Sequence, residues 1–307
     1  MSTTPSLSTY RLAERIYDDL RFTSRSYRRK LALTNREAAV RLCYQHTCKK
    51  KLNLDHPTTL PEVIQWLNLR SDTSRWPELA DKYAVREYVR DCGLENHLNE
   101  LYGYWEQPQD INWSALPDSF VLKLNNGCHS VMPIRDKKVT NKEDVTKQFL
   151  KWMEKPFGLE SAEFHYLPIP PKIIAEKFLH QEPSLIDYKI YCIGGTAQVI
   201  LHCQDRVHEK AVKTLLDTKW NVIPEYNPRP IRTDETPQKP ASLDEIIVAA
   251  EKLSQPFPFV RVDYYEIDGR PVFGEMTFTP AGGYKPYGTQ KFYEDLGMKI
   301  LNLFTNE

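Results

Sequence analysis

The segment FPFVRVDYYEIDGRPVFGEMTFTP, residues 257–280, decides the fold of this chain. Two runs rich in apolar residues flank Asp268-Gly269, a dipeptide typical of tight turns, so the segment is predicted to form a β-hairpin. Its strands nevertheless contain Arg261, Asp263 and Glu275. An arginine and two carboxylates in a half-buried hairpin require either pairing with one another or a function.

The register of the hairpin determines which face these charges occupy. A two-residue turn would place Asp263 opposite Gly274 and would point Glu275 to the other face. A three-residue loop of residues 267–269 would instead pair Arg261 with Glu275. The side chains that would then share one face are Arg261, Asp263, Glu275 and Thr277. We expect the three-residue loop, because it collects the charges on one surface.

Two interpretations of this charged face stay open from the hairpin alone. Asp263 and Glu275 would be diagonal neighbours roughly 7–8 Å apart at their backbones, so both could reach one Mg²⁺. Alternatively, Arg261 and Glu275 form an ion pair on an exposed sheet face.

The composition bounds the class of protein. The chain has 307 residues, of which 41 are Lys or Arg and 41 are Asp or Glu. This neutral balance argues against a general nucleic-acid-binding protein. No apolar run has the length of a membrane span, and the N-terminus lacks the apolar region of a signal peptide. Six irregularly spaced cysteines suggest reduced thiols and a cytoplasmic location.

Hairpin and helix patterns alternate along the chain, which predicts an α+β fold. Residues 1–75 read as helices, and residues 1–51 contain twelve basic against four acidic residues. This basic segment is either a solvated helical face or a docking surface for an anionic polymer, a phospholipid surface or an acidic partner. The segment ELADKYAVREYVRDCGL, residues 78–94, has apolar residues at helical spacing and is predicted to be one helix ending at Gly93.

The segment DSFVLKLNNG, residues 118–127, places Lys123 at the end of a predicted strand, just before a loop that contains a glycine. An ammonium group and loop N–H groups at this point could hold phosphates. The sequence contains neither a Walker loop nor a dinucleotide fingerprint here. A solvated lysine is the alternative.

Six segments in this order resemble the ATP-grasp enzymes, and more narrowly their TupA-like branch, which is linked to teichuronopeptide and capsule biosynthesis. They are LADKYAVREYV, LPDSFVLKLNNG, KIIAEKFL, DYKIYCIGG, QDR and the opening hairpin. The resemblance covers roughly residues 55–305. It implies an ATP-grasp domain at 76–307, with a phosphate-loop subdomain at 76–185 and a metal-binding subdomain at 186–307, after the helical basic region at 1–75.

The resemblance also implies roles for individual residues, with ATP and Mg²⁺ as cofactors. The implied nucleotide-binding residues are Lys82, Lys123, Asn126, Gly127, Glu176, Lys177, Phe178, Leu179, Asp187 and Lys189. The implied catalytic residues are Arg261, Lys123 and Arg206, and the implied metal ligands are Asp263, Glu275 and Thr277. Thr277 stands where many ATP-grasp enzymes have asparagine. The loop NNGCHS has fewer glycines than is usual in this branch.

The implied activity is that of an ATP-dependent carboxylate–amine ligase acting through an acyl phosphate. The expected partners are a sugar carboxylate of the uronic-acid type and an amino acid or amine, with an anionic polysaccharide at the basic N-terminus as a further possibility. No nucleic-acid partner and no membrane span are expected. The rival interpretations are a phosphotransferase on the same fold, a glycosyltransferase of a capsule pathway, and a binding module without catalytic activity.

Overall fold

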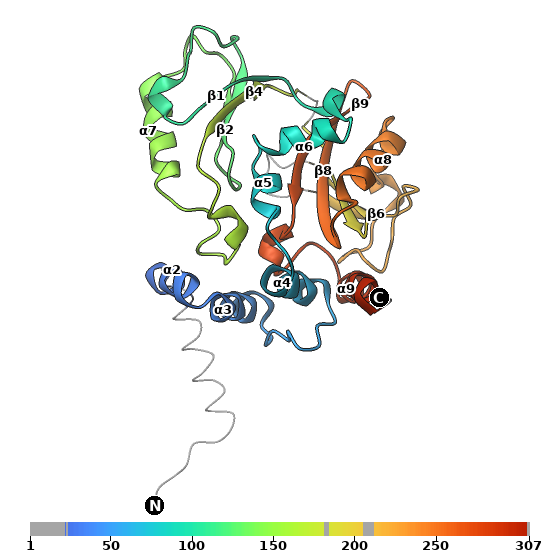
Figure 1. Ribbon diagram of the computed structural model, residues 1–307. Coiled ribbons are helices and arrows are strands. Elements are labelled where there is room, and N and C mark those ends of the chain that lie inside the picture. The colour runs from blue at the N-terminus through green and yellow to red at the C-terminus, as the bar shows by residue number, and fades with distance from the viewer. Residues whose placement is uncertain (1–21, 23, 181–183, 205–211, 306–307) are drawn as a thin grey trace, which may run out of the picture.

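The computed structural model describes residues 22, 24–180, 184–204 and 212–305, and it contains two antiparallel sheets that lie side by side (Figure 1). The strands are β1 (Leu101–Trp105), β2 (Phe120–Leu124), β3 (Val131–Ile134), β4 (Ile173–Lys177), β5 (Asp187–Ile193), β6 (Thr196–Gln204), β7 (Val212–Leu216), β8 (Phe259–Ile267) and β9 (Arg270–Thr277). The smaller sheet has the order β1-β4-β2-β3 and the larger sheet the order β7-β6-β5-β8-β9. The predicted α+β class is confirmed.

Helices cover the sheets and close the molecule at one end (Figure 1). The α-helices are α2 (Arg25–Thr34), α3 (Arg36–Cys48), α4 (Leu60–Arg70), α5 (Trp76–Ala80), α6 (Val85–Asp91), α7 (Lys142–Met153), α8 (Leu243–Ser254) and α9 (Gln290–Thr305). The short 3₁₀ turns are η1 (Glu95–His97), η2 (Pro108–Asp110), η3 (Phe164–Tyr166), η4 (Thr233–Glu235) and η5 (Pro280–Gly283). Within the described residues, no helix is long and apolar enough to cross a membrane.

Each sheet has its own hydrophobic core. Strand β2 alternates buried and half-buried side chains, the period expected of a strand with one face inward. Its buried Phe120 and Leu122 belong to one cluster with Phe149 of α7. The larger sheet packs against α8 on one face, and its core continues into α4 and α9. The two sheets therefore belong to separate hydrophobic clusters.

The opening hairpin turns through two residues, so the predicted three-residue loop is wrong. Ile267 pairs directly with Arg270, and Asp268 and Gly269 take φ values of 53° and 72°. These values suit a tight hairpin turn in which both central residues adopt positive φ, which aspartate tolerates and glycine favours. The preference of Asp268-Gly269 for a two-residue turn therefore determines the register, and not the grouping of the charges.

A β-bulge nevertheless brings the charges to one face. The register shifts between Asp263 and Tyr264, so that Gly274 is an extra residue in β9 and Asp263 pairs with Glu275. A Cβ at Gly274 would lie 3.0 Å from the carbonyl oxygen of Asp263, so glycine allows the strands their close approach here. Arg261 consequently pairs with Thr277. The three-residue loop would have paired it with Glu275.

The helix predicted over residues 78–94 is interrupted. It forms α5 and α6, with a turn between them in which the Oδ1 atom of Asp81 accepts hydrogen bonds from the backbone N–H groups of Tyr83 and Ala84. This side-chain turn competes with helical hydrogen bonding and ends α5. Lys82 therefore leaves the helical path.

The N-terminal helices pack in two ways. Residues of α4, among them Leu60 and Ile64, are fully buried in the same cluster as the larger sheet. Helix α3 instead contributes Val40 and Cys43 to a separate cluster that includes Tyr284 from the segment after β9. The predicted boundary between the N-terminal region (1–75) and the ATP-grasp domain (76–307) thus comes after α4, a helix that packs in the core of the larger sheet.

Candidate active site

The smaller sheet contains a lysine–glutamate pair that is largely shielded from solvent. Lys123 and Glu176 lie on the paired strands β2 and β4, with Lys123 Nζ 2.8 Å from Glu176 Oε2. Asn99 Nδ2 donates to the same oxygen at 3.3 Å, and Arg86 lies 3.7 Å from the other oxygen. Two cations and an amide thus surround the Glu176 carboxylate, which is 10% exposed.

The larger sheet presents a second cluster, centred on Asp263. The guanidinium of Arg261 donates to both carboxylate oxygens, with Nε 2.7 Å from Oδ1 and Nη2 2.6 Å from Oδ2. Lys189, opposite Asp263 on β5, places its Nζ 2.5 Å from Oδ2 and 3.0 Å from Asp187. Burial alone would lower the pKa of Lys189, but the neighbouring Asp263 carboxylate raises it overall. Lys189 is therefore charged in this site.

Glu275 is the more accessible carboxylate of the pair, with a side chain that is 34% exposed. Lys82 Nζ lies 3.3 Å from its Oε2 atom, Arg261 Nη2 lies 3.6 Å from Oε1, and the Thr277 hydroxyl lies 3.3 Å from Oε1. Burial raises the pKa of Glu275, but Lys82, Lys189 and Arg261 together lower it to about 2. Glu275 is therefore ionised throughout the physiological range.

Lys82 connects Glu275 of the larger sheet to the loop that follows β2 of the smaller sheet. Its Nζ donates to the carbonyl oxygen of Gly127 at 2.6 Å as well as pairing with Glu275. Its backbone N–H donates to the carbonyl oxygen of Asn125, whose side chain in turn donates to Asp81 at 2.8 Å. The interruption between α5 and α6 thus carries Lys82 to the predicted phosphate loop, residues 125–130.

The charges around Asp263 and Glu275 are balanced. Three cations face three carboxylates in this cluster: Lys82, Lys189 and Arg261 against Asp187, Asp263 and Glu275. No group of three or more His, Cys, Asp or Glu suited to a metal ion occurs in the described residues. Two carboxylates on adjacent strands nonetheless fit the Mg²⁺ sites in which nucleotide phosphates and water supply the other ligands.

Lys177, Phe178 and Leu179 follow Glu176 at the end of β4. The backbone N–H of Lys177 donates to the carbonyl oxygen of Glu100, and the ring of Phe178 lies 5.5 Å from the Arg135 guanidinium. Leu179 follows directly and is half-buried. Arg206 lies outside the described residues. The roles of these residues in binding adenine or substrate stay predictions.

The site also contains residues that the sequence did not single out. Arg86 and Asn99 contact Glu176, and nothing in their local pattern distinguishes them from surface residues. Asn125 belongs to the predicted phosphate loop, but the sequence did not assign the role that it has here: it is fully buried and donates a hydrogen bond to Asp81 in the turn. A polar residue next to an apolar strand end was the available signal for Asn125, because buried amides need several partners.

Comparison with solved structures finds similar folds at low sequence identity. A D-alanine–D-alanine ligase from Bacillus anthracis complexed with ATP is 14% identical, with a TM-score of 0.44 over 75% of this chain and 64% of that chain. An L-amino acid ligase from Bacillus licheniformis is 15% identical, with a TM-score of 0.45 over 82% of this chain and 57% of that chain. The chain thus spans less than two thirds of the length of either structure.

A sequence search of curated proteins finds no match. The family described as TupA-like ATPgrasp, in contrast, matches residues 62–301, which include both sheets and every predicted site residue. The resemblance of the six sequence segments is confirmed by this match, and the two sheets with their covering helices form the ATP-grasp fold. The chain belongs to the TupA-like ATP-grasp family.

Proposed function

We propose that this protein is an ATP-dependent ligase that joins a carboxylate to an amine. The observation that carries the proposal is the contact of Lys82 with both the loop carbonyl of Gly127 and the carboxylate of Glu275. Together with Lys82, the cations Lys189 and Arg261 surround the carboxylates of Asp263 and Glu275. A further cation, Lys123, lies on the smaller sheet. Phosphoryl transfer depends on this kind of positioning and charge neutralisation more than on covalent catalysis.

The nucleotide would lie between the two sheets. Lys123 and Lys82 would bind its phosphates together with the loop at Asn126 and Gly127. The Glu176–Leu179 segment would bind the adenine, and Asp187 the ribose. Asp263 and Glu275 would hold Mg²⁺, which would neutralise phosphate charge when bound.

The reaction would proceed in two steps. An oxygen of the substrate carboxylate attacks the γ-phosphorus of ATP, which forms an acyl phosphate and releases ADP. The amine nitrogen then attacks the acyl carbon, the bond to phosphate breaks, and the nitrogen loses a proton to give the amide. Arg261 lies on the charged face beside Glu275, where its guanidinium would stabilise negative charge on the transferring phosphoryl group and on the tetrahedral intermediate.

We further propose a uronic-acid-type sugar carboxylate and an amino acid or amine as substrates, in polysaccharide biosynthesis. The resemblance to the TupA-like branch and the basic N-terminal segment support this choice. A reaction that consumes ATP, together with six free thiols, favours the cytoplasm as its location.

A screen for ADP release tests the proposal. Uronic acids and oligouronates are crossed with amino acids and simple amines in the presence of ATP and Mg²⁺. We expect ADP and free phosphate to appear together only when a carboxylate and an amine are both present. ADP release with a stable phosphorylated product and no free phosphate would show a phosphotransferase, and turnover of nucleotide sugars without ATP would show a glycosyltransferase.

A further inference from the structure

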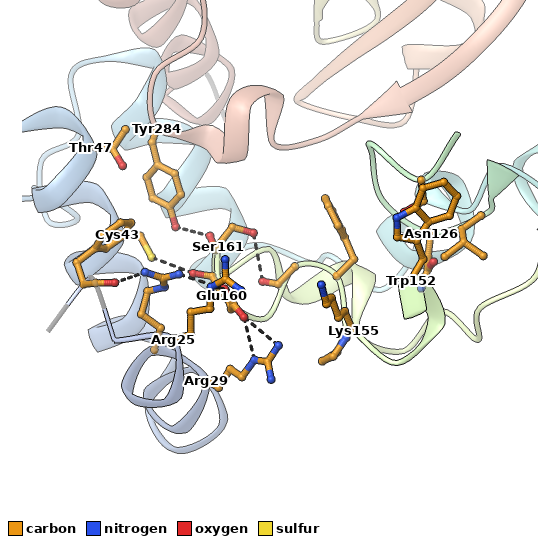
Figure 2. A pocket seen from close by; sticks show the side chains of 17 residues that line it. Arg25, Arg29, Cys43, Thr47, Asn126, Trp152, Lys155, Glu160, Ser161 and Tyr284 are labelled. Atoms are coloured by element: carbon orange, nitrogen blue, oxygen red, sulfur yellow. Dashed lines mark hydrogen bonds and ion pairs between the residues drawn. The ribbon is translucent and has the colours of Figure 1, made fainter. Parts of the chain in front are cut away.

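A cavity of about 490 Å³ lies between the N-terminal helices and the smaller sheet. Figure 2 shows Arg25, Arg29 and Glu160 on one side of this cavity and Asn126 and Trp152 on another. Asn126 belongs to the predicted phosphate loop. A molecule in the cavity would thus contact the same loop as the nucleotide.

The lining of the cavity has a surplus of positive charge. Among the described residues, four cationic side chains (Arg25, Arg28, Arg29 and Lys155) and one carboxylate (Glu160) line it, a surplus of three positive charges. The three guanidiniums converge on that single carboxylate, with N···O distances of 3.8, 3.1 and 2.9 Å for Arg25, Arg28 and Arg29. One such pair would suffice to dock α2, so the other guanidiniums have capacity for a further anion.

Arg28 is the most buried of these cations, with a side chain that is 13% exposed. Its Nη2 donates to Glu160 and its Nη1 to the backbone carbonyl of Phe22, whereas its Nε has no hydrogen-bond partner among the described residues. A buried donor without a partner is costly. Glu160 and Phe22 therefore leave one donor of Arg28 unused.

A chain of contacts joins the cavity to the proposed reaction centre. The ring of Phe157, which lines the cavity, packs so closely on Gly127 that a Cβ there would lie 2.3 Å from it. The carbonyl oxygen of Gly127 accepts from Lys82, which pairs with Glu275. One loop therefore separates the arginines from the proposed phosphoryl-transfer site.

We propose that this cavity binds a second anionic group of the carboxylate substrate. This proposal rests on the proposed function. One carboxylate of the substrate would reach the γ-phosphate, while another on the same molecule would compete with Glu160 for Arg28 and Arg29. The aromatic rings of Phe22, Trp152, Phe157 and Tyr284 also line the cavity and provide apolar surface for rings of the substrate. The geometry therefore favours a ring-based oligomer with a carboxylate on each unit, over a neutral oligomer or an acidic peptide.

Calorimetry with trigalacturonate at about 0.15 M ionic strength, where exposed charges are largely screened, tests this assignment on the full chain. We expect Arg28→Gln to weaken binding at least tenfold and Arg29→Gln about threefold. Lys30→Gln removes an equal charge from the exposed side of the same helix, outside the cavity lining, and should change the affinity less than twofold. Maltotriose, the neutral counterpart, should not bind, and triglutamate should bind more weakly than trigalacturonate.

Glu160→Gln provides the opposite test, because it frees the guanidiniums from their internal carboxylate. We expect it to tighten trigalacturonate binding at least threefold. A purely structural role for Glu160 would leave that affinity unchanged and lower only the melting temperature. Circular dichroism establishes that each variant keeps its helices.

The assignment is overturned if wild-type protein does not bind trigalacturonate, if Lys30→Gln weakens binding as much as Arg28→Gln, or if triglutamate binds more tightly. Binding of Mg²⁺ with a non-hydrolysable ATP analogue, measured in the same samples, separates this failure from failure of the proposed function. Nucleotide binding without a cavity effect refutes the cavity alone. A cavity effect without nucleotide binding refutes the ligase proposal and leaves an anion site.

Discussion

Two ionic clusters flank the predicted phosphate loop, and they differ in how their charges are balanced. Around Asp263 and Glu275, three cations face three carboxylates. All of them except Lys82 lie on strands of the larger sheet, and all except Glu275 have side chains that are at most 11% exposed. Around Glu160, three guanidiniums from one helix meet one carboxylate, and Arg25 and Arg29 are 75% and 42% exposed. The first cluster is self-contained without a ligand. The second has unused positive charge.

The difference has an energetic consequence. Removal of one partner from a buried, balanced cluster leaves an uncompensated charge in a region of low dielectric constant. Removal of a partner from an exposed, unbalanced cluster changes little, because water and salt screen what is left. Substitutions in the two clusters therefore separate a site that is built for precise geometry from one that is built to attract a ligand.

The largest effect is expected from Asp263→Asn, which leaves Arg261 and Lys189 without their shared charge partner. Breaking a buried ion pair costs on the order of 3 kcal/mol of unfolding free energy, and loss of a proposed Mg²⁺ ligand should reduce ADP release at least about 100-fold. Urea unfolding and the ADP-release assay measure the two effects. Asp244→Asn, at a carboxylate with a 93% exposed side chain, is the control and should change neither.

Wild-type ADP release from Asp263→Asn would refute the metal assignment. An unchanged unfolding free energy would show instead that the cluster is not coupled electrostatically, and the comparison between the two clusters would fail.

Lys123→Ala is expected to weaken binding of a non-hydrolysable ATP analogue more than about tenfold, which corresponds to about 1.4 kcal/mol. The reason is that Lys123 would meet the phosphates from the central strand of the smaller sheet. Lys138→Ala, which removes a lysine from an exposed pair with Asp118, serves as the matched control for loss of charge. Equal affinities of Lys123→Ala and wild type in calorimetry would contradict the phosphate role.

The sequence alone located the charged hairpin and predicted that its charges share one face, but it predicted this from a wrong register. The charges argued for a three-residue loop, whereas Asp268-Gly269 adopts the two-residue turn and the Gly274 bulge restores the common face. A bulge depends on the close approach of two strands, which the pattern of one strand does not encode. Periodicity likewise predicted one helix through Lys82, because the Asp81 turn is stabilised by Asn125, a residue distant in sequence.

The basic N-terminal segment shows a different kind of limit. Charge counting marked it as unusual and left two interpretations open, a solvated face or a docking surface. The arrangement of Arg25, Arg28 and Arg29 around Glu160 depends on a contact across 132 residues of sequence between Arg28 and Glu160. Only the contact of α2 with Glu160, in the segment after α7, reveals that the charge lines a cavity.

The pH dependence of stability provides a test at Glu275. Its pKa falls from the usual 4.5 to about 2 in the folded protein, so the unfolded chain binds its proton more readily and the carboxylate stabilises the fold above the unfolded pKa. This contribution should be constant above about pH 5.5 and disappear as the pH falls toward 2. Because the side chain is partly exposed, we expect about 1 kcal/mol rather than the full value of the shift.

Comparison of wild type with Glu275→Gln in urea at several pH values measures this contribution. The difference in unfolding free energy should shrink between about pH 5.5 and pH 2. A difference that grows on acidification would reverse the sign and would mean that the neutral acid is the form that the cluster stabilises.

The smallest effect is expected from Glu160→Gln. Its side chain is 27% exposed, and two of its three partners, Arg25 and Arg29, are substantially exposed, so the loss of unfolding free energy should be below about 1 kcal/mol and should vanish in high salt. Urea unfolding at low and high ionic strength measures it beside Asp263→Asn. A loss as large as that of Asp263→Asn would mean that Glu160 neutralises a buried cluster of its own. The guanidiniums of α2 would then be structural partners rather than groups held ready for an anion.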